Sequence, residues 1–237
     1  MAWRILEYEE IDSTNLEARR LVKAGEIRGG VAVWAHNQTR GRGRRGKPWW
    51  SAPGKSLTAS LVFEEIESAL ATRLVSVSAV DAIRAAGGRG PLIKWPNDLV
   101  YGGRKVAGVL AESFRGPDGH FTVVGIGVNV GFSHAELDIP SRLPATSLLV
   151  EEERQFDIPG LLENLLASLD TRKATDASLL MKEYRELLAW TGETVSVSLP
   201  PTGRLVSGTL TGVDDSGALL LKVDETIMQI EACELLT

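Results

Sequence analysis

Residues 40–47 form a segment in which cations alternate with glycines. It reads Arg-Gly-Arg-Gly-Arg-Arg-Gly-Lys, so five of its eight residues are positively charged. The glycines allow the backbone to come close to a ligand, and arginine binds carboxylate and phosphate through paired hydrogen bonds. Trp49 and Trp50 follow and offer indole faces on which a base can stack. The segment therefore has the groups needed to hold a carboxylate, a phosphate and a purine.

Two well-known phosphate-binding loops do not account for this segment. Gly41 and the pair Gly46-Lys47 have the spacing of a Walker A motif, but Pro48 stands where a hydroxyl residue is required. The glycines open no βαβ unit, which a Rossmann fingerprint would need. A solvated surface loop is the plainer alternative, and the two adjacent indoles count against it.

Lys94 begins the second candidate motif, Lys-Trp-Pro-Asn-Asp, at residues 94–98. It ends a short apolar run, where a buried ammonium needs an anionic partner. The alternative is a lysine that extends its charge to water. Asn97 and Asp98 suit the turn that Pro96 begins.

Two further segments could contribute to a binding site. Gly125 and Gly127 interrupt an apolar strand pattern that ends at Asn129, and glycines inside a strand mark the close approach of another group. Residues 13–15, Ser-Thr-Asn, stand at the start of a predicted helix. They suit helix capping, and the same position suits an anion.

The elements that must position these residues follow from hydrophobic periodicity. Helices are expected at residues 12–25, 68–86, from Asp157 onward, and about 175–190. Strands are expected at residues 31–35, 57–63, 92–95, 98–101, 104–114 and 120–130, and shorter ones at 194–199, 204–213, 218–223 and 226–230. This order predicts an α+β fold, in which a mixed sheet has helices packed on one face, over residues 1–190. Residues 191–237 are expected to form a small antiparallel β-barrel domain.

Composition narrows the function. A net charge of −5 argues against a general nucleic-acid binder. No apolar run approaches the ~20 residues that cross a bilayer, and no signal peptide is apparent, so we expect a cytoplasmic protein without a membrane partner. The single cysteine and three histidines lack ligand spacing, so no protein-held metal site is expected. No covalent nucleophile stands out, so an enzyme with these parts would act by positioning and charge neutralisation.

Residues 41–49, 94–98, 104–110 and 125–129 resemble the biotin protein ligases in order and spacing. Residues 12–15 and the short C-terminal strands fit the same family. The resemblance implies a biotin/lipoate ligase-like catalytic domain followed by a small SH3-like barrel. It also implies a ligase reaction in two steps. Biotin and ATP, with Mg²⁺, give biotinyl-5′-AMP, and biotin then passes to a lysine of a biotin carboxyl carrier protein.

The resemblance also implies site residues. The catalytic residues would be Lys94, Arg42 and Arg44. The biotin-binding residues would be Ser13, Thr14, Asn15, Gln38, Gly41, Arg42, Gly43, Arg44, Lys94, Gly108, Gly125 and Gly127. The ATP-binding residues would be Arg44, Arg45, Trp49, Lys94, Asn97 and Asn129. Lys94 would bridge the biotin carboxylate and the α-phosphate, Trp49 would stack near adenine, and Asn129 would lie near the phosphates and Mg²⁺.

Two other functions stay open at the level of sequence. A lipoate or octanoate ligase or transferase shares the fold. Residues 40–47, which we call the glycine–arginine loop, and the Lys-Trp-Pro-Asn-Asp motif favour biotin. An RNA-binding module would also use arginine, glycine and tryptophan, but the acidic charge counts against it. Twelve residues precede Ser13, which leaves no room for the winged-helix domain of some relatives, so we expect no DNA binding. A homodimer is open, since relatives include monomers and dimers.

Overall fold

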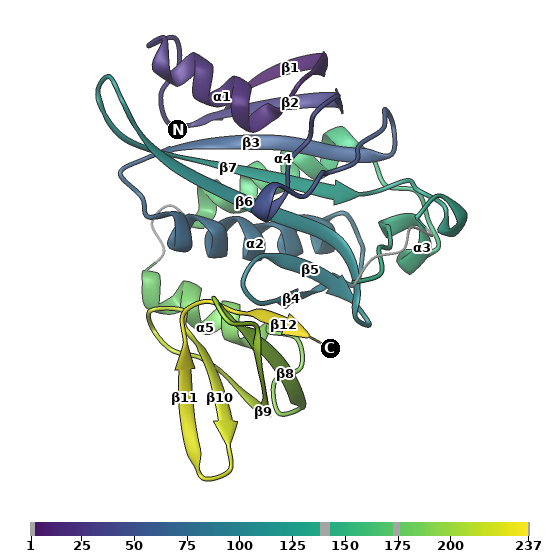
Figure 1. The fold of residues 1–237 in the computed structure, drawn as a ribbon. Coiled ribbons are helices and arrows are strands. Elements are labelled where there is room, and N and C mark those ends of the chain that lie inside the picture. Colours follow the sequence, from purple (N-terminus) through teal and green to yellow (C-terminus); the bar gives the residue numbers. More distant parts are fainter. Residues whose placement is uncertain (1–2, 138–142, 173–175, 237) are drawn as a thin grey trace.

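A seven-stranded sheet forms the larger part of the molecule, in the order β1-β2-β3-β7-β6-β5-β4 (Figure 1). The computed structural model describes residues 3–137, 143–172 and 176–236. The strands are β1 Arg4–Ile11, β2 Val31–Gln38, β3 Ser56–Glu64, β4 Leu92–Lys94, β5 Asp98–Tyr101, β6 Arg104–Gly116 and β7 Gly119–Asn129. β1 pairs with β2 in parallel and the other neighbours are antiparallel, so the predicted mixed sheet is confirmed.

Strand β1 was not expected from the sequence. It lies at the edge of the sheet and pairs only with β2, so none of its residues is fully buried. Glu7, Glu9 and Glu10 give it a polar pattern that hides its strand character. Charged side chains on an edge strand also oppose pairing with a second sheet.

Helices cover both faces of the sheet, which corrects the prediction of helices on one face only. Val31 and Val33 of β2 pack with α1, whereas Ala32 and Trp34 belong to the core on the side of α2 and α4. The unbroken apolar run of β2 is the pattern of a strand buried on both sides.

The helices are α1 Thr14–Lys23, α2 Ser68–Ala85, α3 Leu148–Glu152, α4 Ile158–Arg172 and α5 Ala177–Glu186. No helix in the described ranges is long and apolar enough to span a membrane.

The helix predicted to reach Trp190 ends at Glu186, and its predicted start at Thr175 lies outside the described residues. The chain after it follows β4 instead. The N–H of Ile93 donates to the carbonyl of Leu187 at 2.8 Å, and the N–H of Ala189 donates to Ile93 at 2.9 Å. The backbone thus exchanges helical hydrogen bonds for bonds to a strand, which periodicity does not reveal. The other three predicted helices are confirmed.

A second sheet of five antiparallel strands follows, in the order β11-β10-β9-β8-β12. Its strands are β8 Thr194–Leu199, β9 Arg204–Val213, β10 Leu219–Val223, β11 Thr226–Ile230 and β12 Glu234–Leu236. Four of them lie where the sequence predicts strands, and the three-residue β12 was not expected. Figure 1 shows this sheet next to α5, with β12 on the side of β4.

Candidate functional site

A cavity of about 550 Å³ brings together most of the residues selected from the sequence. It lies among the start of α1, the 41–49 loop, the β4–β5 turn, β6, β7 and the chain around β12. The selected residues that line it are Ser13, Thr14, Asn15, Gln38, Arg42, Gly43, Arg44, Arg45, Trp49, Lys94, Asn97, Gly108, Gly125, Gly127 and Asn129. Gly41 is not among the lining residues. A Cβ on Gly41 would lie 2.4 Å from the carbonyl oxygen of Trp49, so this glycine serves the packing of the loop on itself.

Side chains at the start of α1 join in a hydrogen-bonded group that we call the polar chain, made of Thr14, Asn15, Gln38, Ser60 and Glu112. Gln38 Oε1 accepts from the backbone N–H of Thr14 at 2.8 Å and from its hydroxyl at 3.1 Å. Ser60 Oγ lies 2.7 Å from Thr14 Oγ1 and 2.6 Å from Asn15 Oδ1. Because Thr14 occupies the oxygen of the Gln38 amide, Nε2 is the donor that Gln38 offers to a ligand.

The opposite end of the polar chain fixes the orientation of Asn15. Its Nδ2 donates to Glu112 Oε2 at 2.8 Å and to the carbonyl of Leu110 at 3.3 Å. With two acceptors at the nitrogen and a hydroxyl at the oxygen, one orientation of the amide satisfies all its partners. Glu112 was not selected from the sequence, because nothing local marks a strand glutamate as a partner of residue 15.

The glycines of β7 are explained by what lies on them. A Cβ on Gly125 would lie 2.3 Å from Asn15 Oδ1, and one on Gly127 would lie 2.3 Å from Cε2 of Trp49. Neither position has space for any other residue. The prediction that these glycines mark close approach is confirmed. Trp49 therefore crosses β7, and Lys105 Nζ lies 5.6 Å from the centroid of its ring.

The glycine–arginine loop folds back on itself and contacts two other parts of the cavity wall. Gly43 donates to the carbonyl of Lys47 at 2.7 Å. Arg44 donates to Asn97 Oδ1 at 2.8 Å, which joins the loop to the β4–β5 turn. Arg45, which has a left-handed φ of 56°, lies 3.4 Å from the Glu234 carboxylate of β12. The loop thus spans the cavity between the two sheets.

Lys94 ends β4, is half-buried and lines the cavity. Its Nζ lies 5.8 Å from the centroid of the Trp190 ring, within the range of a cation–π contact. Burial raises the pKa of the nearby Cys233 thiol to about 11, although Arg44, Arg45 and Lys94 oppose that shift. This burial disfavours the reactive thiolate form of Cys233.

The cavity also contains residues that the sequence did not assign to it. Lys105 Nζ lies 2.6 Å from Asp98 Oδ1, and both residues line the cavity. Residues 233–236 of the second sheet line it as well. Lys105 and Asp98 belong to the sequence motifs and could have been chosen for that reason. The C-terminal residues carry no such signal, because their position depends on how the two sheets pack.

The donor set fits a Mg²⁺ ion that arrives bound to phosphate. No group of three or more histidine, cysteine, aspartate or glutamate residues capable of holding a metal is found in the described chain. Mg²⁺ in nucleotide sites takes one or two side-chain oxygens, and phosphates and water supply the rest. The amide oxygen of Asn129 and the carboxylate of Asp98, both in the cavity wall, are ligands of that type.

The chain was compared with known proteins. A model of the biotin/lipoate A/B protein ligase family matches residues 8–129. The biotin–[acetyl-CoA-carboxylase] ligase of Paracoccus denitrificans is 36% identical over 223 residues, which cover 89% of this chain and 91% of that protein. The bifunctional ligase/repressor BirA of Bacillus spizizenii is 29% identical, over 99% of this chain and 74% of the relative.

A structural comparison agrees. The biotin protein ligase from Aquifex aeolicus, solved in complex with biotin and ATP, matches with a TM-score of 0.79 and 28% identity. The match covers 98% of this chain and 97% of that structure. The resemblance inferred from the four sequence motifs is confirmed. The chain belongs to the biotin/lipoate A/B protein ligase family, and within it groups with the biotin protein ligases.

Proposed function

We propose that this protein is an ATP-dependent biotin protein ligase. It forms biotinyl-5′-AMP from biotin and Mg-ATP, and transfers biotin to a lysine of a biotin carboxyl carrier protein. The observation that carries the proposal is one cavity lined by three members of the polar chain, by Trp49 and by three cations. These residues are Thr14, Asn15, Gln38, Trp49, Arg42, Arg44 and Lys94. The names of the matched ligases and the biotin and ATP bound to the Aquifex aeolicus protein support it.

In the first step a carboxylate oxygen of biotin attacks the α-phosphorus of ATP. A new O–P bond forms, and the bond to the leaving pyrophosphate breaks. The two reactants repel each other, so cations placed where the charge gathers supply most of the acceleration. Lys94 would touch both reactants, Arg42 and Arg44 would hold carboxylate and phosphate oxygens, and Trp49 would stack near adenine. Holding the reactants in attack geometry supplies much of the remainder.

In the second step the neutral amine of the acceptor lysine attacks the carbonyl carbon of the mixed anhydride. A C–N amide bond forms, the bond from that carbon to the AMP oxygen breaks, and the amine loses a proton. The anhydride also reacts with water, so the loop must exclude solvent until the acceptor arrives. The contacts of Arg44 with Asn97 and of Arg45 with Glu234 would hold the loop across the cavity.

The polar chain favours biotin over lipoate. The ureido group of biotin has a carbonyl that accepts from an amide N–H and two N–H groups that donate to oxygens. The dithiolane ring of lipoate lacks such groups and would leave the Gln38 Nε2 donor without a partner in the ligand. Sites with buried hydrogen-bonding groups reject ligands that cannot pair with them, because unpaired buried groups are costly.

Replacement of Gln38 by alanine is expected to raise the dissociation constant of biotin about fivefold, the value of one ordinary hydrogen bond. The reason is the loss of the Nε2 donor that Thr14 holds in place. Calorimetric titration with biotin measures the dissociation constant. The matched control is Asn37→Ala, which removes the neighbouring amide, since Asn37 bonds to Glu10 and does not line the cavity. Equal affinities for the two variants would contradict the role of Gln38.

Residues 1–190 are proposed as the catalytic domain and residues 191–237 as a separate SH3-like barrel. The second sheet supports that division, since it contains the antiparallel strands β8 to β12 and has its own strand order. The cytoplasmic location stays a prediction from the sequence, and the sequence leaves open whether the protein forms a homodimer.

Pyrophosphate exchange tests the proposed reaction. With wild-type protein, Mg-ATP and labelled pyrophosphate, we expect label to enter ATP when biotin is added and not when lipoate replaces it. Addition of a biotin carboxyl carrier domain should then give a product heavier by one biotinyl group, located on a single lysine by mass spectrometry. Exchange supported by lipoate instead of biotin would favour the alternative ligase, and exchange with neither would refute the proposal.

A further inference from the structure

The turn between β9 and β10, residues 214–217, is held in shape by the second sheet; we call it the docking turn. Asp214 Oδ1 accepts from Ser216 Oγ at 2.7 Å and from the N–H of Ala218 at 2.9 Å. Asp214 Oδ2 accepts from Gln229 Nε2 at 3.0 Å. The hydrogen bond from Ser216 is the main reason why the pKa of Asp214 is lowered. The turn therefore has a defined conformation that residues of the second sheet support.

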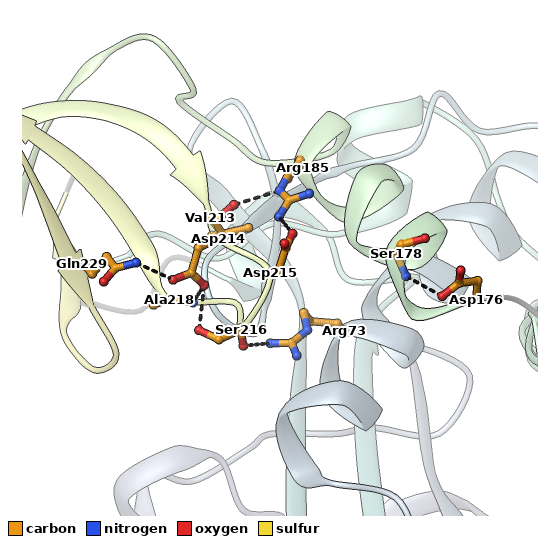
Figure 2. Close-up of polar contacts among 10 residues, drawn as sticks. All are labelled: Arg73, Asp176, Ser178, Arg185, Val213, Asp214, Asp215, Ser216, Ala218 and Gln229. Carbon is orange, nitrogen blue, oxygen red and sulfur yellow. Dashed lines mark hydrogen bonds and ion pairs between the residues drawn. The ribbon is translucent and has the colours of Figure 1, made fainter.

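Two arginines of the larger part bind the docking turn (Figure 2). Arg185 of α5 donates from Nε to the carbonyl of Val213 at 2.8 Å and pairs with the carboxylate of Asp215. Arg73 of α2 donates to the carbonyl of Ser216 at 3.1 Å. Because the arginines come from different helices, the turn locates the second sheet relative to both.

A side chain at Gly217 would displace the guanidinium of Arg73. Gly217 has a φ of +90°, and a Cβ there would lie 1.9 Å from Nη1 of Arg73. Burial lowers the pKa of Arg73, since desolvation disfavours its charged form. Its Nε is buried without a hydrogen-bond partner within the described structure. A guanidinium enclosed in this way depends on the few acceptors that the turn provides.

The docking turn reaches the cavity through Trp95, whose Nε1 donates to the carbonyl of Gly217 at 2.9 Å. Trp95 directly follows Lys94 and is buried. Strand β4 has only three residues and pairs with β5 on one side. On its other side it bonds to residues 187–189 of the connection between the sheets. Part of the support for β4, at Ile93 next to Lys94, thus comes from outside the seven-stranded sheet.

We propose that the docking turn is a positioning element for Lys94: its contacts with Arg73, Arg185 and Trp95 hold the end of β4 where the lysine meets the reacting groups. The inference rests on the function proposed above. A displacement of about 1 Å in a positioning group can cost up to about a hundredfold in rate. Loosening the turn should therefore slow adenylation and leave the binding of biotin at the polar chain unchanged.

The test compares Gly217→Ala with Gly203→Ala in the full chain. Gly203 has a φ of +72° in another turn of the same sheet, and a Cβ there would meet no atom nearer than 3.9 Å. Both substitutions carry the same kind of backbone penalty, and only the first disturbs the contact with Arg73. For Gly217→Ala we expect kcat of biotin-dependent pyrophosphate exchange to fall about fivefold below the control, with the Kd of biotin within about twofold.

Trp95→Phe provides a second test, because it keeps an aromatic side chain, although a smaller one, and removes the N–H donor. We expect the same pattern of lower kcat with unchanged biotin affinity, and this variant decides alone if Gly217→Ala fails to fold. The inference is overturned if kcat matches the Gly203→Ala control, or if biotin affinity falls in proportion to kcat. A wild-type protein without biotin-dependent exchange would refute the proposed function, and this inference with it. Normal wild-type exchange together with unaffected variants would refute the inference alone.

Discussion

Replacement of Lys94 by alanine is expected to lower the rate of biotinyl-AMP formation by about a thousandfold, in the upper range for loss of one group that stabilises transition-state charge. Lys94 lines the cavity from the end of β4, where it would face both the carboxylate and the α-phosphate. Single-turnover formation of labelled adenylate from biotin and Mg-ATP measures the effect without interference from product release.

Lys55→Ala is the matched control for this experiment. Lys55 is also a partly exposed lysine close to the large sheet, but it pairs with Glu136 and does not line the cavity. Both variants should keep the wild-type circular dichroism spectrum. Adenylate formation at the normal rate by folded Lys94→Ala protein would remove Lys94 from the mechanism.

Replacement of Arg44 by alanine is expected to release biotinyl-AMP to solvent about tenfold faster or more. Arg44 joins the glycine–arginine loop to Asn97 at 2.8 Å, and its guanidinium would also hold the adenylate phosphate. Hydrogen bonds to charged groups contribute about 1.5 kcal/mol or more, and each 1.4 kcal/mol is about a factor of ten in an equilibrium constant. The measurement is the loss of labelled adenylate from preloaded protein during a chase with unlabelled biotin and ATP.

Arg40→Ala controls for the loss of a loop cation. Arg40 is an exposed arginine at the start of the same segment and does not line the cavity. The Arg40→Ala substitution lowers the net positive charge of the loop by the same amount as Arg44→Ala, so a general electrostatic effect would appear in both variants. Equal release rates for Arg44→Ala and wild type would show that the loop does not retain the intermediate.

The sequence by itself determined the elements and chemistry that depend on neighbours along the chain. Gly125 and Gly127 interrupt a strand pattern, and the glycines alone predicted that another group approaches the backbone there. The structure identifies the approaching side chains as Asn15 and Trp49. The position of Lys94 at a strand end and the cations of residues 40–47 are equally local features. Order and spacing of four motifs were then sufficient to indicate the family.

Only the tertiary structure decided which distant segments meet. The edge strand β1 has no apolar run of its own, and α1 lies on the face opposite α2 and α4. Glu112 orients Asn15 across 97 positions, and Gly217 holds Trp95 across 122. Such pairs depend on how sheets and helices pack, and side-chain periodicity contains information about burial but none about the identity of the partner.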